Sequence, residues 1–159
     1  MRRKHAPRTL LIEIPGMPAL RLGHLVLDFN GTLARDGVLL PGVRARLRRL
    51  SERLDVYVLT ADTFGTARSA LRGVNLELRI VSTGTEKRRF VSACDGAVAI
   101  GNGRNDVPMM RVAELSIAVL GPEGSSAELL RAAQIVVRDI VDALDLLLRP
   151  KRVTATLRR

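Results

Sequence analysis

The chain has 159 residues, 47% of them hydrophobic, so it is long enough to bury a core and too apolar to be intrinsically disordered. Aromatic residues make up only 3% and Trp is absent, which argues against a stacking surface for single-stranded nucleic acid. The net charge of +10 fits either a solvated arginine surface or an acidic partner. We favour the solvated surface, because many arginines are scattered or fall on one helix, and we do not expect nucleic acid as the partner.

Cysteine usage and hydropathy bear on the compartment. Cys94 is the only cysteine, so no internal disulfide can form, which fits a reducing environment. The basic residues at the start are followed by an apolar stretch that Glu13 and Pro15 interrupt, so we expect no signal peptide. No run approaches the ~18 apolar residues of a membrane span. We therefore expect a soluble, cytoplasmic protein that does not enter the membrane.

Short apolar strands alternate with amphipathic helices along the chain. Residues 8–14 and 19–23 alternate in polarity around a Pro-Gly turn, which predicts a hairpin. His24–Phe29 is typical of a strand buried on both faces, and Pro41-Gly42 opens a helix with its leucines on one stripe. The remaining predicted elements are strands over 56–59, 76–81, 97–100, 115–120 and 134–137, and helices over 63–72, 85–94, 105–113, 125–132 and 139–149.

This alternation predicts an α/β fold, a three-layer sandwich with a doubly wound, mainly parallel sheet. We expect a single domain over 1–159, with a short N-terminal hairpin. The segments 1–7 and 151–159 are expected to be flexible basic tails. Residues 35–38 form only a small flap after the first long strand, so no cap domain is expected.

The last predicted helix, 139–149, is apolar nearly all round. Two interpretations stay open. The helix is either buried in the core of its own chain, or it forms a subunit interface and makes a homo-oligomer.

Polar residues gather where the predicted strands end. The carboxyl ends of parallel strands are where such sheets bind ligands. The residues concerned are Asp28 through Thr32, Thr60 with Asp62, Ser82 with Thr83, and Asn102 through Asp106. Most of these carry oxygen groups that bind phosphate or metal, so a site is expected at this edge of the sheet.

Asp28-Phe29-Asn30-Gly31-Thr32 directly follows a buried strand. A carboxylate at a strand end is held by a rigid element and still faces the crevice, as a nucleophile must be. Gly31 lets backbone N–H groups turn toward an anion, and Thr32 can tie the loop down. Taken alone, the same residues also fit an ordinary turn.

Three further groups complete the pattern. Asn102 and Asp106, in Gly101-Asn102-Gly103-Arg104-Asn105-Asp106, offer oxygen ligands suited to a hard cation, although the segment also fits a capped turn. Thr60 ends its strand with a hydroxyl that could bond a phosphoryl oxygen. Lys87, near a helix start, could place a positive charge on the same phosphate, or could simply be solvated.

Taken in order, these groups resemble the four motifs of the haloacid dehalogenase-like superfamily across nearly the whole chain. Asp28-Phe29-Asn30-Gly31-Thr32 is similar to the first motif, Thr60 to the second, Lys87 to the third and the segment 101–106 to the fourth. The Gly-x-Gly-x-Asn-Asp form of the fourth motif resembles the soluble proteins likened to the phosphorylation domain of P-type ATPases.

The resemblance implies an Mg²⁺-dependent phosphohydrolase or phosphotransferase that forms an aspartyl-phosphate on Asp28 and acts on a phosphorylated substrate of unknown identity. The catalytic residues it implies are Asp28, Asn30, Thr60 and Lys87. The ion would be held by Asp28, Asn30, Asn102 and Asp106, and the transferring phosphate by Gly31, Thr60, Lys87 and Asn105. Such chemistry depends on positioning and charge neutralisation.

Two residues depart from the superfamily pattern. Asn30 stands where its phosphatases have an Asp that serves as general acid and base, and the loss of such a group typically costs ~10²–10⁴ in rate. Asn102 replaces an Asp that binds the metal in many relatives, which lowers the charge of the site and should weaken Mg²⁺ binding.

Three functions are therefore compared. The first is a phosphohydrolase, slowed by Asn30. The second is a phosphorylatable or regulatory domain with negligible turnover. The third, which we rank last, is a basic nucleic-acid-binding module in which the strand-end residues are only turns.

Overall fold

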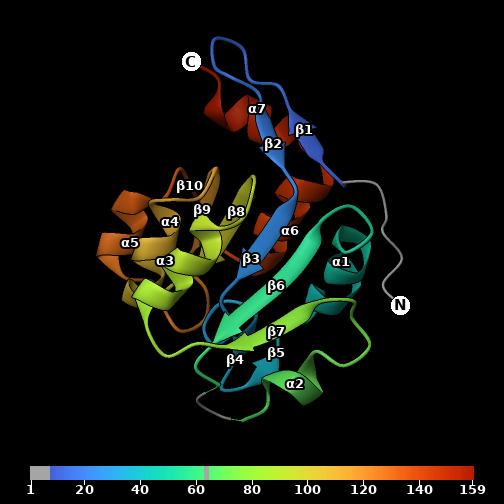
Figure 1. Cartoon of the computed structure of the whole chain (residues 1–159), viewed down its shortest axis with the longest axis vertical. Coiled ribbons are helices and arrows are strands. Elements are labelled where there is room, and N and C mark those ends of the chain that lie inside the picture. Colours follow the sequence, from blue (N-terminus) through green and yellow to red (C-terminus); the bar gives the residue numbers. More distant parts are fainter. Residues whose placement is uncertain (1–7, 63–64) are drawn as a thin grey trace.

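The structure is a computed structural model that describes residues 8–62 and 65–159. Its centre is a six-stranded sheet in which every neighbouring pair is parallel, in the order β10-β9-β8-β3-β6-β7 (Figure 1). The strands are β3 His24–Leu27, β6 Asp55–Thr60, β7 Glu77–Ile80, β8 Ala97–Gly101, β9 Leu115–Val119 and β10 Ile135–Val137. The expected doubly wound α/β architecture is confirmed.

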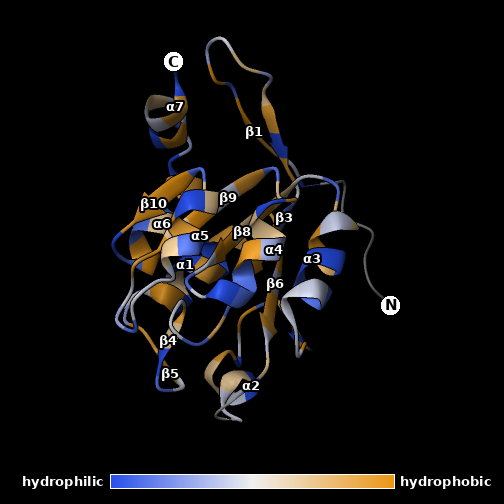
Figure 2. Ribbon diagram, turned by 90° about the vertical axis from the view of Figure 1, so that its left-hand side faces the viewer, coloured by the Kyte–Doolittle hydropathy of each residue, from blue (hydrophilic) through white to orange (hydrophobic). Residues whose placement is uncertain are grey.

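Helices cover both faces of the sheet (Figures 1 and 2). On one face, α1 (Val43–Leu50) packs against α6 (Ile140–Leu148). On the other face lie α3 (Gly84–Ser92), α4 (Val107–Met110) and α5 (Ala127–Ala132). Each strand packs against both helical layers, because its successive side chains point to opposite faces of the sheet.

Each face of the sheet has its own hydrophobic core. Leu25 and Leu27 belong to the core under α1 and α6, whereas Val26 belongs to the core under α4. On β8 the α4 side is lined by Ala97 and Ala99, whose small side chains leave room for that helix to lie close to the sheet.

The order of the strands places the site. The chain runs from β3 to β6 and β7 on one side, then crosses back to β8, β9 and β10 on the other. The direction of winding thus reverses between β3 and β8. A crevice forms at the carboxyl ends of strands at such a switch point, and Asp28 directly follows β3 there.

Two antiparallel hairpins flank the sheet, at opposite ends of the molecule in Figure 1. The predicted N-terminal hairpin is formed by β1 (Leu10–Ile12) and β2 (Leu20–Leu22). The predicted flap is formed by β4 (Ala34–Arg35) and β5 (Val38–Leu39), which are joined through Asp36-Gly37, both with positive φ. Thr66 Oγ1 donates a hydrogen bond to the Gly37 carbonyl, which ties the flap to the start of α2 (Ala67–Ala70).

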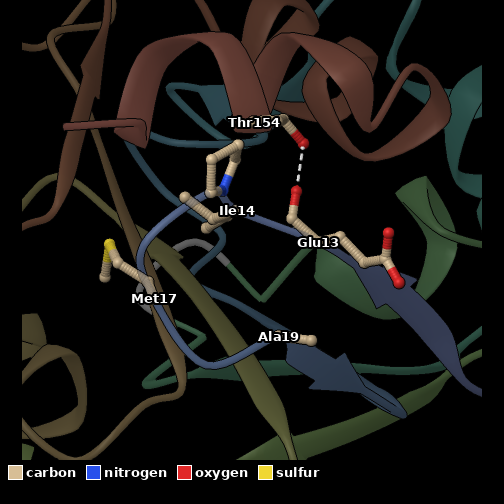
Figure 3. A pocket seen from close by; sticks show the side chains of 6 residues that line it. Glu13, Ile14, Met17, Ala19 and Thr154 are labelled. Carbon is tan, nitrogen blue, oxygen red and sulfur yellow. Dashed lines mark hydrogen bonds between the residues drawn. The ribbon is translucent and has the colours of Figure 1, made fainter.

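The C-terminal segment corrects one prediction. Residues 151–159 were expected to be a flexible tail, but Lys151–Leu157 forms helix α7. The helix is fixed because Val153 is fully buried in the core and Thr154 Oγ1 donates to the Glu13 carbonyl (Figure 3). An open cavity of about 520 Å³ lies between this helix and the N-terminal hairpin. The other expected tail, 1–7, lies outside the described residues.

Several element boundaries also differ from the predictions. The predicted helix 105–113 is a 3₁₀ turn, η1 (Arg104–Asp106), followed by the short α4, because Pro108 lacks the N–H that a continuous helix needs there. The predicted helix 63–72 includes two residues outside the described part of the chain, and α2 covers only Ala67–Ala70. The apolar side chains of α6, from Ile140 to Leu148, are buried inside the chain apart from the half-buried Val141. None of the described helices is long and apolar enough to cross a membrane.

Three arginines of α1 contact the chain itself rather than only solvent. Arg46 makes a bidentate pair with Asp145 of α6, with N–O distances of 2.8 and 3.1 Å. Arg44 donates to the carbonyls of Ala70 and Arg72, and Arg48 to that of Gly73, so both hold the end of α2. A guanidinium can make several such bonds at once, which a lysine cannot. Part of the positive charge therefore has a structural role.

Helix α7 gives a test of the corrected C-terminal segment. Val153→Ala should lower the free energy of unfolding by about 2 kcal/mol, because it removes buried methyl groups and leaves a cavity. In a chain of this size the loss corresponds to a decrease in Tm of about 4–8 °C, measurable by thermal scanning. Arg152→Ala, at an exposed neighbouring position, is the control. Equal Tm values for the two variants would show that α7 is not docked.

Candidate active site

The site is built around Asp28, which the central strand β3 delivers to the crevice. Its backbone N–H donates to the Ile100 carbonyl of β8 at 3.0 Å, so the residue is anchored between the two strands. The Phe29 N–H points to its carboxylate and the Thr32 hydroxyl lies 3.4 Å from Oδ2. Asp28 is 8% exposed, so it is mostly buried but still reachable.

Lys87 joins two carboxylates. Its ammonium donates to Asp28 Oδ1 at 2.7 Å and to Asp106 Oδ1 at 2.6 Å, and the residue is only 1% exposed. It lies in the first turn of α3, whose start is fixed by a capping box between Thr83 and Glu86. A cation so close to a helix N-terminus is opposed by the helix dipole, so its place there is explained by the two carboxylates.

Asp106 fixes the loop that follows β8. Its Oδ2 accepts hydrogen bonds from the backbone N–H groups of Asn102 and Gly103, at 3.1 and 3.0 Å. A Cβ on Gly101 would lie 2.4 Å from the same oxygen, so only glycine fits there. Asp106 is completely buried and both of its oxygens are engaged.

A second loop completes the site from the far side. The segment after β9 fixes Asn102 by two hydrogen bonds. The Asn102 Nδ2 donates to the Gly124 carbonyl, and the Asn102 backbone carbonyl accepts from the Ser126 N–H. A Cβ on Gly121 would lie 2.7 Å from the Gly31 carbonyl, so the two loops touch through their backbones. This segment is not among the residues that the sequence predicts for the site. Its Gly-Pro-Glu-Gly composition directly after a strand was the available signal.

Asn102 and Thr32 link the first and fourth motifs. The Thr32 hydroxyl donates to Asn102 Oδ1 at 3.1 Å, and a Cβ on Gly31 would lie 2.4 Å from Asn102 Nδ2. Gly31 has φ +79°, a conformation that favours glycine. The oxygen of Asn102 is thus held close to Asp28 through Thr32, which contacts both.

Burial dominates the electrostatics of the cluster. Desolvation, followed by the charge of Asp106, raises the pKa of Asp28 from 3.8 to about 6, although Lys87 and the Phe29 N–H oppose the change. Burial alone would lower the pKa of Lys87, but the charges and hydrogen bonds of the two carboxylates outweigh it and the pKa rises. One ammonium therefore does not fully compensate two buried carboxylates.

Other predicted residues are less tightly tied to the cluster. Thr60 is buried at the end of β6, beside β3, but its hydroxyl accepts from Asp62 N at 3.0 Å. Asn105 is exposed in η1. Among the described residues, no hydrogen bond joins either side chain to Asp28 or Lys87. Their contact with a phosphate stays a prediction.

Asn30 has an unusual environment. Its side-chain oxygen is buried, yet within the described residues it accepts no hydrogen bond. Such an orphaned acceptor marks a place where a bound group would lie. Together with the Asp28 carboxylate and the Asn102 amide oxygen it provides the hard oxygen donors that Mg²⁺ takes. The described residues contain no cluster of three His, Cys, Asp or Glu side chains, so amide or carbonyl oxygens would have to contribute.

Comparisons with known proteins were made for sequence and for structure. No protein-family model matches the chain. The uncharacterized protein MJ0073 of Methanocaldococcus jannaschii is 49% identical over 61 residues, which are 38% of this chain and 66% of that protein. MJ0072, an uncharacterized protein of the same organism, is 51% identical over 39 residues, 24% of this chain and 89% of that protein.

The solved structures that are similar share one fold. A 3-deoxy-D-manno-octulosonate 8-phosphate phosphatase from Moraxella catarrhalis, in complex with magnesium, phosphate and KDO, has TM-score 0.64 and 15% identity over 84% of this chain and 90% of its own. The haloacid dehalogenase-like protein SP0104 from Streptococcus pneumoniae has TM-score 0.57 and 13% identity, over 78% and 97%. A zinc-transporting P-type ATPase has TM-score 0.61 and 22% identity, over 74% of this chain and 20% of its own. The chain belongs to the same family as MJ0072, and its fold is that of the haloacid dehalogenase-like hydrolases.

Proposed function

We propose that the chain is an Mg²⁺-dependent phosphohydrolase that works through an aspartyl-phosphate on Asp28. The observation that carries the proposal is the Asp28–Lys87–Asp106 cluster at the switch point of the sheet. An accessible carboxylate oxygen and a fixed ammonium are two of the parts that phosphoryl transfer needs. The similar fold of phosphatases supports the same reading.

In this mechanism each residue has a limited task. The Asp28 oxygen attacks phosphorus in line, held in place by β3 and the Phe29 N–H. Lys87 stabilises the negative charge on the phosphoryl oxygens, and Asp106 keeps Lys87 oriented. We further propose that Thr60 and Asn105 bind the remaining phosphoryl oxygens. The Gly31 N–H, which was also expected to do so, already donates to the Ala34 carbonyl at 2.8 Å. Water then releases the phosphate from Asp28.

The residues that would bind the metal follow from which oxygen atoms of the cluster can accept a further ligand bond. Asp28, Asn30 through its side-chain oxygen, which is unpaired within the described residues, and Asn102 would hold the ion, with Asp106 behind them, because both Asp106 oxygens already accept hydrogen bonds. Bound Mg²⁺ would neutralise charge on the phosphoryl group and on Asp28. The raised pKa of Asp28 supports this, since burial and the charge of Asp106 outweigh Lys87 there and an added cation would stabilise the carboxylate.

A second candidate is favoured by Asn30. Because an amide cannot activate water, a phosphorylated Asp28 could persist, and the domain would then act as a regulatory switch with negligible turnover. The two candidates differ in one rate, that of phosphoenzyme hydrolysis.

The first test asks whether phosphoryl transfer requires Asp28. With Mg²⁺ and acetyl phosphate or p-nitrophenyl phosphate, the wild-type chain should become labelled on Asp28 and release phosphate, and Asp28→Asn should do neither. Phosphate release and acid-stable protein labelling are the measurements. Labelling without release supports the regulatory candidate. Release that persists in Asp28→Asn rules out the aspartyl-phosphate.

The second test asks whether Asn30 limits hydrolysis of the phosphoenzyme. Asn30→Asp should speed hydrolysis of the phosphoenzyme by about 10²–10⁴-fold, because it restores a group that can take a proton from water. The decay of isolated, labelled protein measures this step directly. Asn30→Gln, which adds length but no acid, is the control. Equal decay rates for wild type and Asn30→Asp would show that another step is limiting.

The buried charge gives a third test, on stability in EDTA. Since the pKa of Asp28 is about 6 in the folded chain and near 3.8 when unfolded, the folded state binds more protons between these values. Stability contributed by this group therefore falls as pH rises from about 4 to 6. Asp28→Asn removes the effect, so its Tm relative to wild type should be higher at pH 7.5 than at pH 4.5.

Adding Mg²⁺ provides the control for that experiment. The ion should raise the Tm of the wild type at pH 7.5, because it compensates the Asp28 carboxylate, and should have little effect on Asp28→Asn. A Tm difference between the two proteins that does not change with pH would contradict the electrostatic account.

A further inference from the structure

The cluster that holds Asp28 offers no carboxylic acid to a departing group, and its lysine is engaged by two carboxylates. Lys87 uses its ammonium in two short bonds, of 2.7 and 2.6 Å, and is 1% exposed. Asp106 is completely buried and accepts from Lys87 and from two backbone N–H groups. The third N–H of Lys87 is the one assigned above to the phosphoryl oxygens, and Asp106 cannot turn toward a leaving oxygen without breaking a buried ion pair, which would be costly.

Asn30, two residues after Asp28, cannot serve as a general acid either. Asn30 carries an amide, whose N–H groups can donate a hydrogen bond but cannot transfer a proton. Its buried oxygen, which has no partner within the described part of the chain, can only accept. A departing oxygen therefore meets no acid there.

The neighbouring loops carry the carboxylates of Asp62, Asp36 and Glu123, the last of which is exposed between Gly121 and Gly124. Asp62 follows Thr60, and its Oδ1 accepts from Ala67 N, which fixes it at the start of α2. Asp36 is exposed in the flap turn. Both aspartates have positive φ, of 53° and 48°. Asn tolerates this conformation, so each carboxylate can be removed with little change to its turn.

From these observations we propose that the site takes phosphoryl groups only from leaving oxygens that are weak bases, as in acyl phosphates and phosphoanhydrides, and not from alkyl phosphate esters. The inference rests on the function proposed above and names its substrate class. The bond from phosphorus to the leaving oxygen breaks as the bond to Asp28 forms. Its electron pair stays on the leaving oxygen, which departs as an anion, so total charge is conserved without a proton.

The size of the effect follows from the basicity of the leaving oxygen. A carboxylate leaving group has a pKa of about 4 and a phosphate about 6, so each is stable as an anion near pH 7. A phenol lies at about 10. The pKa of an alkyl alcohol is far higher, close to that of water, so its anion leaves slowly unless it is protonated. The lack of a general acid therefore slows the reaction only when the leaving oxygen is strongly basic.

The test is a leaving-group series with the full chain and Mg²⁺. The quantity measured is kcat/KM, because it reports the steps up to departure of the leaving group and not hydrolysis of the phosphoenzyme. The substrates are acetyl phosphate, a nucleoside diphosphate, substituted phenyl phosphates and glycerol 3-phosphate. We expect kcat/KM to fall steeply along the phenyl series, and to be lower for glycerol 3-phosphate than for acetyl phosphate by at least about 10²–10⁴-fold.

Asn30→Asp is the decisive variant. Its gain in kcat/KM should be larger for glycerol 3-phosphate than for acetyl phosphate by about 10²-fold or more, and the slope along the phenyl series should become shallower. Asp36→Asn, Asp62→Asn and Glu123→Gln are the matched controls, and the ratio between the two substrates should stay as in the wild type. A loss confined to glycerol 3-phosphate in any control would identify that carboxylate as an acid and overturn the proposal.

The outcomes separate this inference from the proposed function. If no substrate labels Asp28 or is turned over in an Asp28-dependent way, the proposed function itself fails. If turnover depends on Asp28 but the wild type uses glycerol 3-phosphate as well as acetyl phosphate, only the leaving-group inference fails.

Discussion

The pairing of Lys87 with Asp28 and Asp106 is the constraint on which the site depends. A buried ammonium is costly unless it is paired, and here it is held by two carboxylates that reach it from different strands. Asp28 follows β3 and Asp106 lies beyond β8, so the ion pairs form only when these strands are neighbours. The same interaction thus links fold and chemistry. At Asp28, burial and the charge of Asp106 still outweigh the lysine, so the pKa of this carboxyl is raised to about 6.

Much of the fold could be predicted from the sequence, because hydrophobic periodicity depends on the burial that the sheet imposes. The buried run before Asp28 and the stripe on α1 are examples. Helix α7 could not be predicted in this way, since Val153 lies among basic and polar residues that resemble a solvated tail. Its helical state depends on docking against the N-terminal hairpin, more than a hundred residues away in sequence.

The candidate site shows a similar division. The side chains that the structure joins directly, Asp28, Lys87 and Asp106, could be predicted because their chemistry and their places at strand ends point the same way. The spacing of residues in the sequence could not show that one Asp106 oxygen binds Lys87 while the other binds the loop after β8. The contribution of Gly121 and Gly124 was missed for a different reason. It consists of backbone carbonyls and close approach, which leave no chemical signature in the side chains.

The strand order has a consequence for how the chain folds. β3 lies at the centre of the sheet, although it is made early, and its partner β8 comes about seventy residues later. During synthesis, Leu25 to Leu27 must therefore remain without one neighbouring strand until Ala97–Gly101 has emerged. Pairing over such a sequence separation is slow, and an apolar strand edge that waits for its partner is exposed to aggregation. In the growing chain the Asp28 carboxylate likewise has no lysine partner until Lys87 has emerged, and no second carboxylate shares that lysine until Asp106 follows.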